Sequence, residues 1–189
     1  MNFLKNITTL PIIEVYFEFN HLKQLYRQGW LKRGVPESRC ESVAEHSFAV
    51  ALLSLFLADI YYLELDLFKV IKMALIHDIG EIYTGDLIPA DNVASYKKYQ
   101  LEKKSISRVL GKLPKGLDYI SIWEEFEEGE SQEAQFVRQI DRLEMAFQAG
   151  IYENQNFIDP SEFFETVKQN LTLPELKDIL KELETLRLS

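Results

Sequence analysis

The chain has 189 residues, 47% of them hydrophobic, with a formal net charge of −9 and a pI near 4.9. This length fits one domain with a sizeable core, and an acidic surface disfavours binding to long nucleic acids, whose phosphates it repels. The single cysteine, Cys40, excludes an intramolecular disulfide and a multi-thiolate metal site, and it fits a reducing compartment.

Three helices are predicted in the first half of the chain, over Ile12–Gln28, Ser42–Tyr62 and Leu67–His77. In each of them apolar side chains recur at steps of three and four residues, which is the period of a helix with one buried face. Ser42 and Glu45 have the form of a capping box at the start of the second helix, and Asp66 is a candidate N-cap for the third. Gly29 is expected to end the first.

The second half of the chain begins with residues 79–91, where glycines and a proline predict irregular backbone. Helical periods then return, and the predicted helices are Asn92–Leu110, Leu117–Glu128, Gln132–Ala149 and two amphipathic helices that start near Pro160 and Pro174. Ser131 caps the third of these helices, and Gly150 is its expected C-terminal glycine. Because no strand alternation, repeat or long linker occurs, the sequence predicts an all-α fold of one domain, residues 1–189.

The sequence also predicts a soluble protein. Residues 1–9 lack the apolar run and cleavage site of a signal peptide, and the longest apolar stretch, Phe48–Ile60, is interrupted by Ser54 and Asp59. That stretch is shorter than the ~20 residues that a membrane span needs. We therefore expect a cytoplasmic protein that binds no membrane.

Charge is unevenly distributed along the chain. The segment His21–Cys40 has five basic side chains against one acid, Glu37, and is either solvated surface or a source of phosphate contacts. The segment Glu124–Glu133 has six glutamates and is expected to be solvated surface.

A histidine and an aspartate, His77 and Asp78, end the third predicted helix, and Glu81 follows about one turn later. An adjacent imidazole and carboxylate suit a divalent metal that must also hold water and an anionic substrate. His46 lies on the apolar face of the helix that Ser42 starts. A core histidine satisfied by a hydrogen bond is the alternative interpretation of His46.

One further carboxylate is expected to face the core. Asp141 lies between Val137 and Met145 at four-residue steps, and a buried carboxylate needs a charge partner or a metal. Pairing with Arg138, three residues earlier, is the alternative to metal binding. The neighbours Arg142 and Glu144 are expected to face solvent. Because these candidates lie far apart in sequence, only the fold can unite them.

In this order the residues resemble the HD-domain metal-dependent phosphohydrolases, whose pattern is a histidine, a later His-Asp pair and a distant aspartate. More narrowly, the chain is similar to the 5′-deoxynucleotidase subgroup. The segments that carry this similarity are 42–47, 77–86, 88–92, 123–126 and 139–145. The resemblance covers about residues 20–155, and it implies a helical bundle on which the C-terminal helices, residues 156–189, pack.

The resemblance implies a metal site made by His46, His77, Asp78 and Asp141. The mixed nitrogen and oxygen donors suit Mn²⁺, Co²⁺, Fe²⁺ or Zn²⁺ without choosing between them. By position, Glu81 matches the family's acid that orients the nucleophilic water or passes a proton to the leaving 5′ oxygen. Asp86 matches a second acid near the sugar and phosphate, although turns also favour aspartate for local reasons.

The family's phosphate contact is an arginine shortly before a tryptophan. Here the run is Arg27-Gln28-Gly29-Trp30, followed by Arg33, whereas some relatives have arginine directly before the tryptophan. This departure leaves Arg27 and Arg33 as rivals, with Arg27 favoured. Trp30 either lines the nucleoside pocket or is a core tryptophan.

The expected function is metal-dependent hydrolysis of (deoxy)nucleoside 5′-monophosphates to nucleoside and phosphate. One alternative keeps the fold but changes the substrate to a deoxynucleoside triphosphate, a (p)ppGpp alarmone or a cyclic nucleotide. Another is a non-catalytic, metal-binding helical module. Homodimers are common in the resembled family, so a homodimer is a candidate assembly, although no residue in the sequence identifies an interface.

Overall fold

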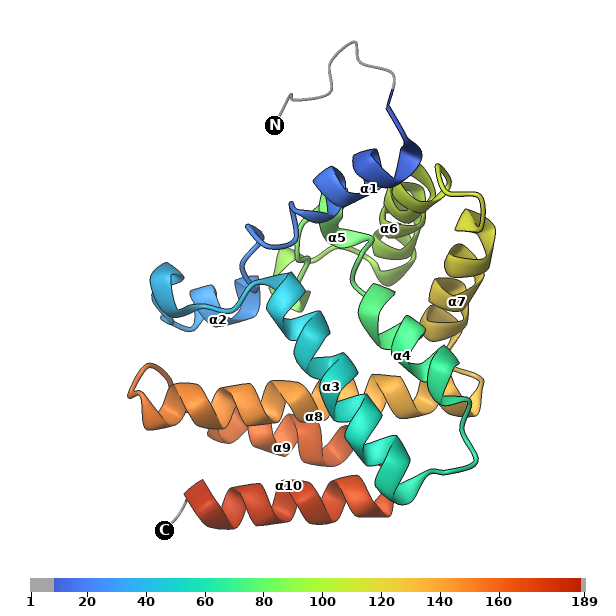
Figure 1. Cartoon of the computed structure of the whole chain (residues 1–189). Helices are drawn as coiled ribbons and strands as arrows, with labels where there is room; N and C mark the ends of the chain where they lie inside the picture. Colours follow the sequence, from blue (N-terminus) through green and yellow to red (C-terminus); the bar gives the residue numbers. More distant parts are fainter. Residues whose placement is uncertain (1–8, 188–189) are drawn as a thin grey trace.

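The computed structural model describes residues 9–187 and is built from helices joined by short turns (Figure 1). Within this range no strand occurs, and one isolated antiparallel bridge joins Tyr26 and Ser42. The α-helices are α1 (Pro11–Phe19), α2 (Gln28–Lys32), α3 (Val43–Tyr61), α4 (Leu67–Ile76), α5 (Glu81–Thr84), α6 (Ser95–Leu110), α7 (Gly116–Glu128), α8 (Gln132–Asn154), α9 (Ser161–Asn170) and α10 (Pro174–Arg187). The all-α prediction is confirmed. The expectation about a signal peptide falls almost entirely on residues 1–8, which lie outside the described range.

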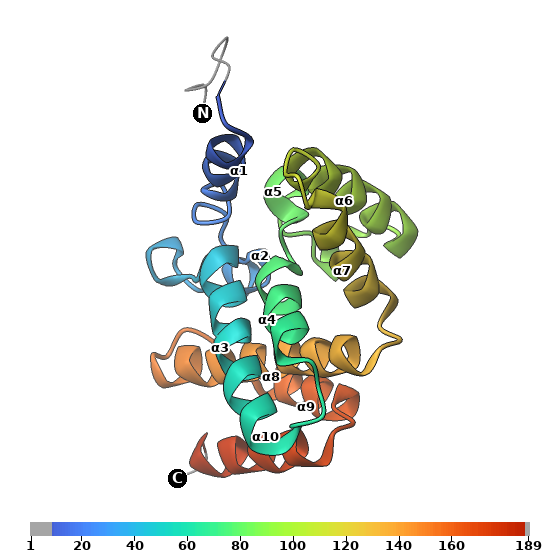
Figure 2. The same ribbon diagram turned by 45° about the vertical axis from the view of Figure 1, so that its right-hand side comes forward.

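The long helix α8 is the centre of the bundle. Helices α3, α4 and α7 contact it, as do α9 and α10 (Figures 1 and 2). Val137, Ile140 and Leu143 of α8 are completely buried in the larger of two hydrophobic clusters. Burying each such side chain contributes roughly 1.5–3 kcal/mol relative to exposure.

The smaller hydrophobic cluster lies around α6 and α7. It joins Val15 of α1 and Ile79 to Ile106 and Trp123, the last two of which are completely buried. The turn that contains His77 and Asp78 leads from α4, which packs in the larger cluster, to Ile79 in the smaller one. Packing on both sides therefore fixes the position of this turn.

The predicted caps form as expected. The Ser42 side chain accepts a hydrogen bond from the backbone N–H of Glu45 at 3.2 Å, and Glu45 Oε2 accepts one from the N–H of Ser42 at 2.7 Å. Asp66 caps α4 through the N–H of Lys69, and Ser131 caps α8 through the N–H of Ala134. Each cap satisfies a backbone donor that the helix leaves free, which is worth about 1 kcal/mol.

Two predicted helix ends are wrong. The first helix ends at Phe19 and not at Gln28, because the backbone of the following segment bonds instead to residues 41–44, including Arg27 N–H to Glu41 O at 3.0 Å. Helix α8 runs through Gly150 to Asn154, and α10 packs beside it. In the first case tertiary contacts outweigh the helical period of residues 20–28, and in the second they outweigh a local glycine signal.

Helix α3 is long and apolar enough to cross a membrane when judged by length and composition alone. The central helix of a soluble protein passes the same test, and α3 buries one face that includes His46, Val50 and Ser54 in the bundle. Its opposite face exposes Phe48 and Phe56. The bundle has the form of a soluble domain, with α3 as one of its core helices.

Candidate metal centre and active site

The first predicted ligand, His46, lies one turn inside α3, just after the capping box. Its side chain is completely buried. The Nδ1 atom lies 2.6 Å from Glu144 Oε2, while Nε2 lies 3.1 Å from Asp141 Oδ1 and 3.7 Å from Asp78 Oδ2. The capping box therefore fixes the turn of α3 that carries His46. The His46 ring lies between the carboxylate of Asp78, in the turn after α4, and those of Asp141 and Glu144 in α8.

The second histidine, His77, follows the last residue of α4 and is 3% exposed. Its Nδ1 lies 2.8 Å from the carbonyl oxygen of Ala74, and its own carbonyl accepts a hydrogen bond from Trp123 Nε1 at 3.0 Å. Gly80 allows α6 to approach this turn, because a Cβ there would lie 2.9 Å from Cβ of Glu102. The Ala74 carbonyl thus orients the imidazole, while α6 and α7 fix the backbone of the turn.

Side chains from three helical regions converge on one point. Ligand atoms of His46, His77 and Asp78 all lie within 4.8 Å of one another. Asp78 Oδ2 is 3.2 Å from His77 Nε2. Asp141 of α8 belongs to the same cluster, because its Oδ1 contacts His46 Nε2. The fold therefore brings together the four residues that the sequence suggested as ligands.

The chemistry of these atoms fits a divalent cation. Each Nδ1 faces an oxygen that can only accept, so Nδ1 carries a proton and Nε2 presents its lone pair in the neutral ring. Both Nε2 atoms are buried, and neither has a hydrogen-bond partner among residues 9–187. They face carboxylate oxygens, which are also acceptors, so a positive charge must lie among them. A proton or a metal ion can supply that charge.

The pKa values show how strongly the cluster attracts positive charge. Burial lowers the pKa of His46, but the carboxylates of Asp141 and Glu144 outweigh this effect and raise it to about 10. For Asp78, burial raises the pKa, and the imidazoles and Arg27 outweigh it and lower the pKa well below its usual range. A divalent ion bound there would therefore compete with protons for the same atoms.

We expect metal binding to release a proton. Because the pKa of His46 is raised to about 10, its ring is protonated at neutral pH, and a metal must displace that proton. Apparent affinity for Mn²⁺ should then fall about tenfold per pH unit, for each proton displaced, as the pH is lowered. Calorimetric titration in buffers of different ionisation enthalpy counts the protons released. Binding without proton release at pH 7 would contradict this assignment.

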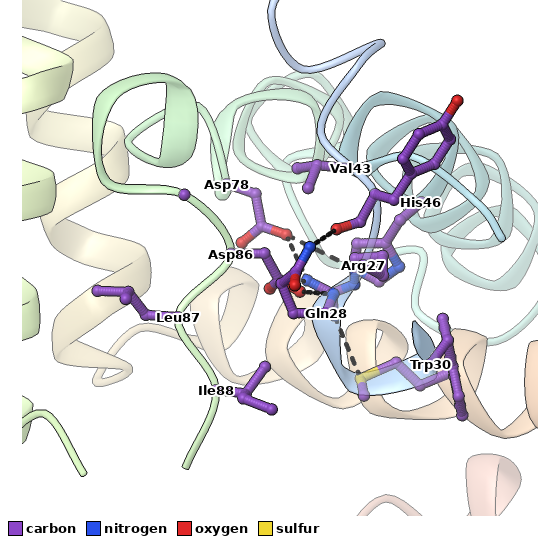
Figure 3. A network of polar contacts seen from close by, with 12 residues as sticks. Arg27, Gln28, Trp30, Val43, His46, Asp78, Asp86, Leu87 and Ile88 are labelled. Carbon is purple, nitrogen blue, oxygen red and sulfur yellow. Dashed lines mark hydrogen bonds and ion pairs between the residues drawn. The ribbon is translucent and has the colours of Figure 1, made fainter. Parts of the chain in front are cut away.

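Arg27 lies beside the cluster, at the start of α2. Figure 3 shows its guanidinium between the carboxylates of Asp78 and Asp86. Nη1 lies 3.4 Å from Asp78 Oδ2 and 3.1 Å from Asp86 Oδ1. The Nη2 atom contacts the sulfur of Met145 at 3.7 Å. Burial lowers the pKa of Arg27, but these acids outweigh it and raise it further above its usual range, so the arginine remains a fixed cation.

Glu81 and Asp86 are both buried near the candidate ligands. Glu81 is 2% exposed, and its Oε2 has no hydrogen-bond partner in the described part of the chain. Burial, followed by the charges of Asp78 and Asp86, raises its pKa well above the ordinary value. Asp86 accepts from the backbone N–H of Gln28 at 2.5 Å as well as from Arg27. Asp86 thereby links the Thr-Gly-Asp turn to α2.

Trp30 and Arg33 line a cavity next to Arg27, together with Asp86, Ile88 and Met145. Trp30 is 2% exposed, packs against Tyr152 and Phe163, and donates from Nε1 to Glu41 Oε1 at 2.7 Å. It is thus a core tryptophan with one edge on the cavity. Arg33 is exposed at the rim and donates to the carbonyl of Gly29 at 3.1 Å.

A second, more polar cavity lies against His77, Asp78 and Asp141 and is lined also by Lys98 and Glu127. Lys98 is half-buried and lies 3.5 Å from Glu102 Oε1. The sequence had not indicated this lysine. The sequence does contain one signal for it: Lys98 precedes Glu102 by four residues, the spacing at which side chains pair on a helix.

One expectation about α8 is wrong, and one alternative interpretation does not hold. Glu144 does not face solvent: it is 4% exposed and contacts His46. Arg138 does not pair with Asp141, because its Nη1 donates to the carbonyl oxygens of Phe126 and Glu127. The signal for Glu144 was available, since residues three apart share a helix face and Asp141 was expected to face the core. Arg142 is half-buried beside the polar cavity.

Comparison with known proteins agrees with this arrangement. A family model described as HD domain matches residues 19–182. The chain is 35% identical over 186 residues to the 5′-deoxynucleotidase HDDC2 of Dictyostelium discoideum, which covers 90% of this chain and 97% of that protein. The human protein of the same name is 32% identical over 170 residues, covering 88% and 81%.

Solved structures show the same fold. A conserved hypothetical protein from Pyrococcus furiosus superposes with a TM-score of 0.77 at 32% identity, covering 92% of this chain and 99% of that one. A predicted metal-dependent phosphohydrolase from Magnetospirillum magnetotacticum gives a TM-score of 0.73 at 26% identity, with 94% of each chain covered. The family model matches residues 19–182, and this range includes every residue of the cluster described above, from Arg27 to Glu144. The chain therefore belongs to the HD-domain family.

Proposed function

We propose that the protein is a metal-dependent 5′-nucleotidase that hydrolyses (deoxy)nucleoside 5′-monophosphates to nucleoside and phosphate. The observation that carries this proposal is the cluster itself, in which the buried His46 and His77 face two partly buried carboxylates while Arg27 lies alongside. A site for a divalent ion thus adjoins a fixed cation suited to one phosphate group. The names of the relatives support the substrate class, since they are 5′-deoxynucleotidases.

We infer that His46, His77, Asp78 and Asp141 hold the metal. When bound, a divalent ion polarises a phosphoryl oxygen and lowers the pKa of its water, which supplies a nucleophile near neutral pH. The donor set fits Mn²⁺, Co²⁺, Fe²⁺ or Zn²⁺. The identity of the ion is open to measurement by elemental analysis of the purified protein.

The remaining residues are assigned by their positions. Arg27, oriented by Asp86, binds the phosphate, and the apolar cavity wall near Trp30 receives the nucleoside. Glu81 lies where it can orient the attacking water or give a proton to the leaving 5′ oxygen. Its raised pKa favours the protonated carboxyl, which is the form that can donate.

The direct test is phosphate release from a panel of nucleotides with Mn²⁺ or Co²⁺, compared with the same reactions in chelator. We expect turnover of 5′-monophosphates that disappears on chelation, and little turnover of triphosphates. Preference for a polyphosphate would favour the alternative HD-type hydrolase. Stoichiometric metal with no hydrolysis of any phosphate ester would favour the non-catalytic module.

The rival arginines can be separated by comparing two variants. Arg27→Ala is expected to lower kcat/KM about 10–100-fold, because a buried charge-assisted contact of about 1.5–3 kcal/mol is lost. Arg33→Ala should have a much smaller effect, since Arg33 is exposed at the rim. Steady-state kinetics on a deoxynucleoside monophosphate measures both. A larger loss for Arg33→Ala would reverse the assignment.

We also propose that residues 1–189 act as one HD domain, with the C-terminal helices in residues 156–189 packed on it. Contacts of α9 and α10 with α8 support this division. We further propose that the protein is cytoplasmic and acts on a small nucleotide, without nucleic-acid or membrane partners. The proposed assembly is a homodimer. Sedimentation of the purified protein measures the oligomeric state.

A further inference from the structure

The carboxylate of Glu144 lies behind His46 and has no part in the proposed reaction. Glu144 Oε2 is 2.6 Å from His46 Nδ1, and the exposed fractions of the two side chains are 5% and 0%. Nδ1 is the ring nitrogen that points away from Asp78 and Asp141. Glu144 therefore touches the imidazole from the side opposite the cluster.

Burying this carboxylate is costly unless a hydrogen bond or a positive charge compensates it. An ionised side chain loses its hydration on burial, and a nearby carboxylate adds repulsion. Glu41 is that neighbour: its ligand oxygen, the Glu144 oxygen and a His46 nitrogen all lie within 4.8 Å of one another. Glu41 is already engaged by Trp30, whereas Glu144 is directed at the imidazole.

The two histidines of the cluster differ in what holds them. His77 Nδ1 faces a neutral backbone carbonyl, Ala74 O, at 2.8 Å, whereas His46 Nδ1 faces a carboxylate. A carboxylate that accepts the Nδ1 proton fixes the tautomer and ring orientation, and it makes Nε2 a stronger donor to a metal. The hydrogen bond that Nδ1 makes is therefore stronger in His46 than in His77.

We propose that Glu144 is a positioning residue that holds His46 with its Nε2 lone pair toward the cluster and strengthens that nitrogen as a metal ligand. This inference rests on the metal site of the proposed function, but not on the identity of the substrate. Glu144 acts through His46 and contacts neither metal nor nucleotide.

The test measures Mn²⁺ affinity, without nucleotide, for the wild type, Glu144→Ala and Glu144→Gln. We expect Glu144→Ala to weaken affinity about 10–100-fold. Glu144→Gln should weaken it less, because its amide oxygen still accepts the Nδ1 proton but carries no charge. Glu153→Ala is the matched control: Glu153 is a glutamate of the same helix that pairs with Arg187, and its loss should leave the affinity unchanged.

Kinetics supplies a second measurement, which would not change if Glu144 only stabilised the fold. The metal concentration for half-maximal rate should rise by the same factor in Glu144→Ala, while kcat recovers at saturating metal. Wild-type affinity in Glu144→Ala would overturn the proposal. So would an equal loss in Glu41→Gln, because Glu41 and Glu144 would then bind the ion themselves.

Circular dichroism checks that the variants are folded. Should Glu144→Ala not fold, Glu144→Gln decides, and wild-type affinity in that variant would overturn the proposal. Failure of the nucleotidase proposal gives a different pattern: no nucleotide turnover in any variant, with the metal affinities still ordered as expected. The two failures are thus distinguishable.

Discussion

Asp141→Asn is expected to lose metal and activity together. Asp141 is the carboxylate that α8 contributes, and its Oδ1 lies 3.1 Å from His46 Nε2. Asparagine keeps the shape of the side chain but removes the negative charge that a divalent ion requires. Metal affinity should therefore fall by more than the about 10–100-fold typical of an outer carboxylate, and phosphate release should fall in parallel.

Elemental analysis and Mn²⁺ titration of the purified variant measure this loss. Asp178→Asn is a suitable control, because Asp178 is an exposed aspartate of α10 and its replacement changes the net charge equally. An Asp141→Asn protein that retains stoichiometric, tightly bound metal would remove Asp141 from the ligand set. Thermal unfolding with and without metal separates lost binding from lost folding.

Glu81→Ala is expected to keep the metal and lose rate. Glu81 is buried next to Asp78 and Asp86, but it is not needed as a ligand. General acid–base catalysis contributes typically 10²–10⁴-fold, so kcat should fall by about that factor while Mn²⁺ affinity changes little. Glu128→Ala, which removes an exposed glutamate at the end of α7, is the control and should retain full activity.

The pH profile tests which role Glu81 has. If its protonated form donates to the leaving oxygen, kcat of the wild type falls as the pH rises through its raised pKa, because the acid form is lost. The Glu81→Gln variant should lack that limb of the profile. A fully active Glu81→Ala protein would show that neither role applies.

Much of the fold follows from local patterns. The capping box at Ser42 and Glu45 and the caps Asp66 and Ser131 gave the starts of α3, α4 and α8, because these side chains bond to backbone groups only a few residues away. The ends of α1 and α8 were missed. They depend on contacts with residues distant in sequence, which no local pattern contains.

For the site, the His77-Asp78 pair and the apolar helix faces of His46 and Asp141 indicated the candidate ligands, and the ordered resemblance implied that they form one metal site. Only the tertiary structure decided what lies around them. It puts Arg27 between Asp78 and Asp86, leaves Arg33 at the rim, and turns Glu144 inward onto His46. The reason is physical: a side chain's type and helix face are local properties, whereas its partners depend on how separate helices pack.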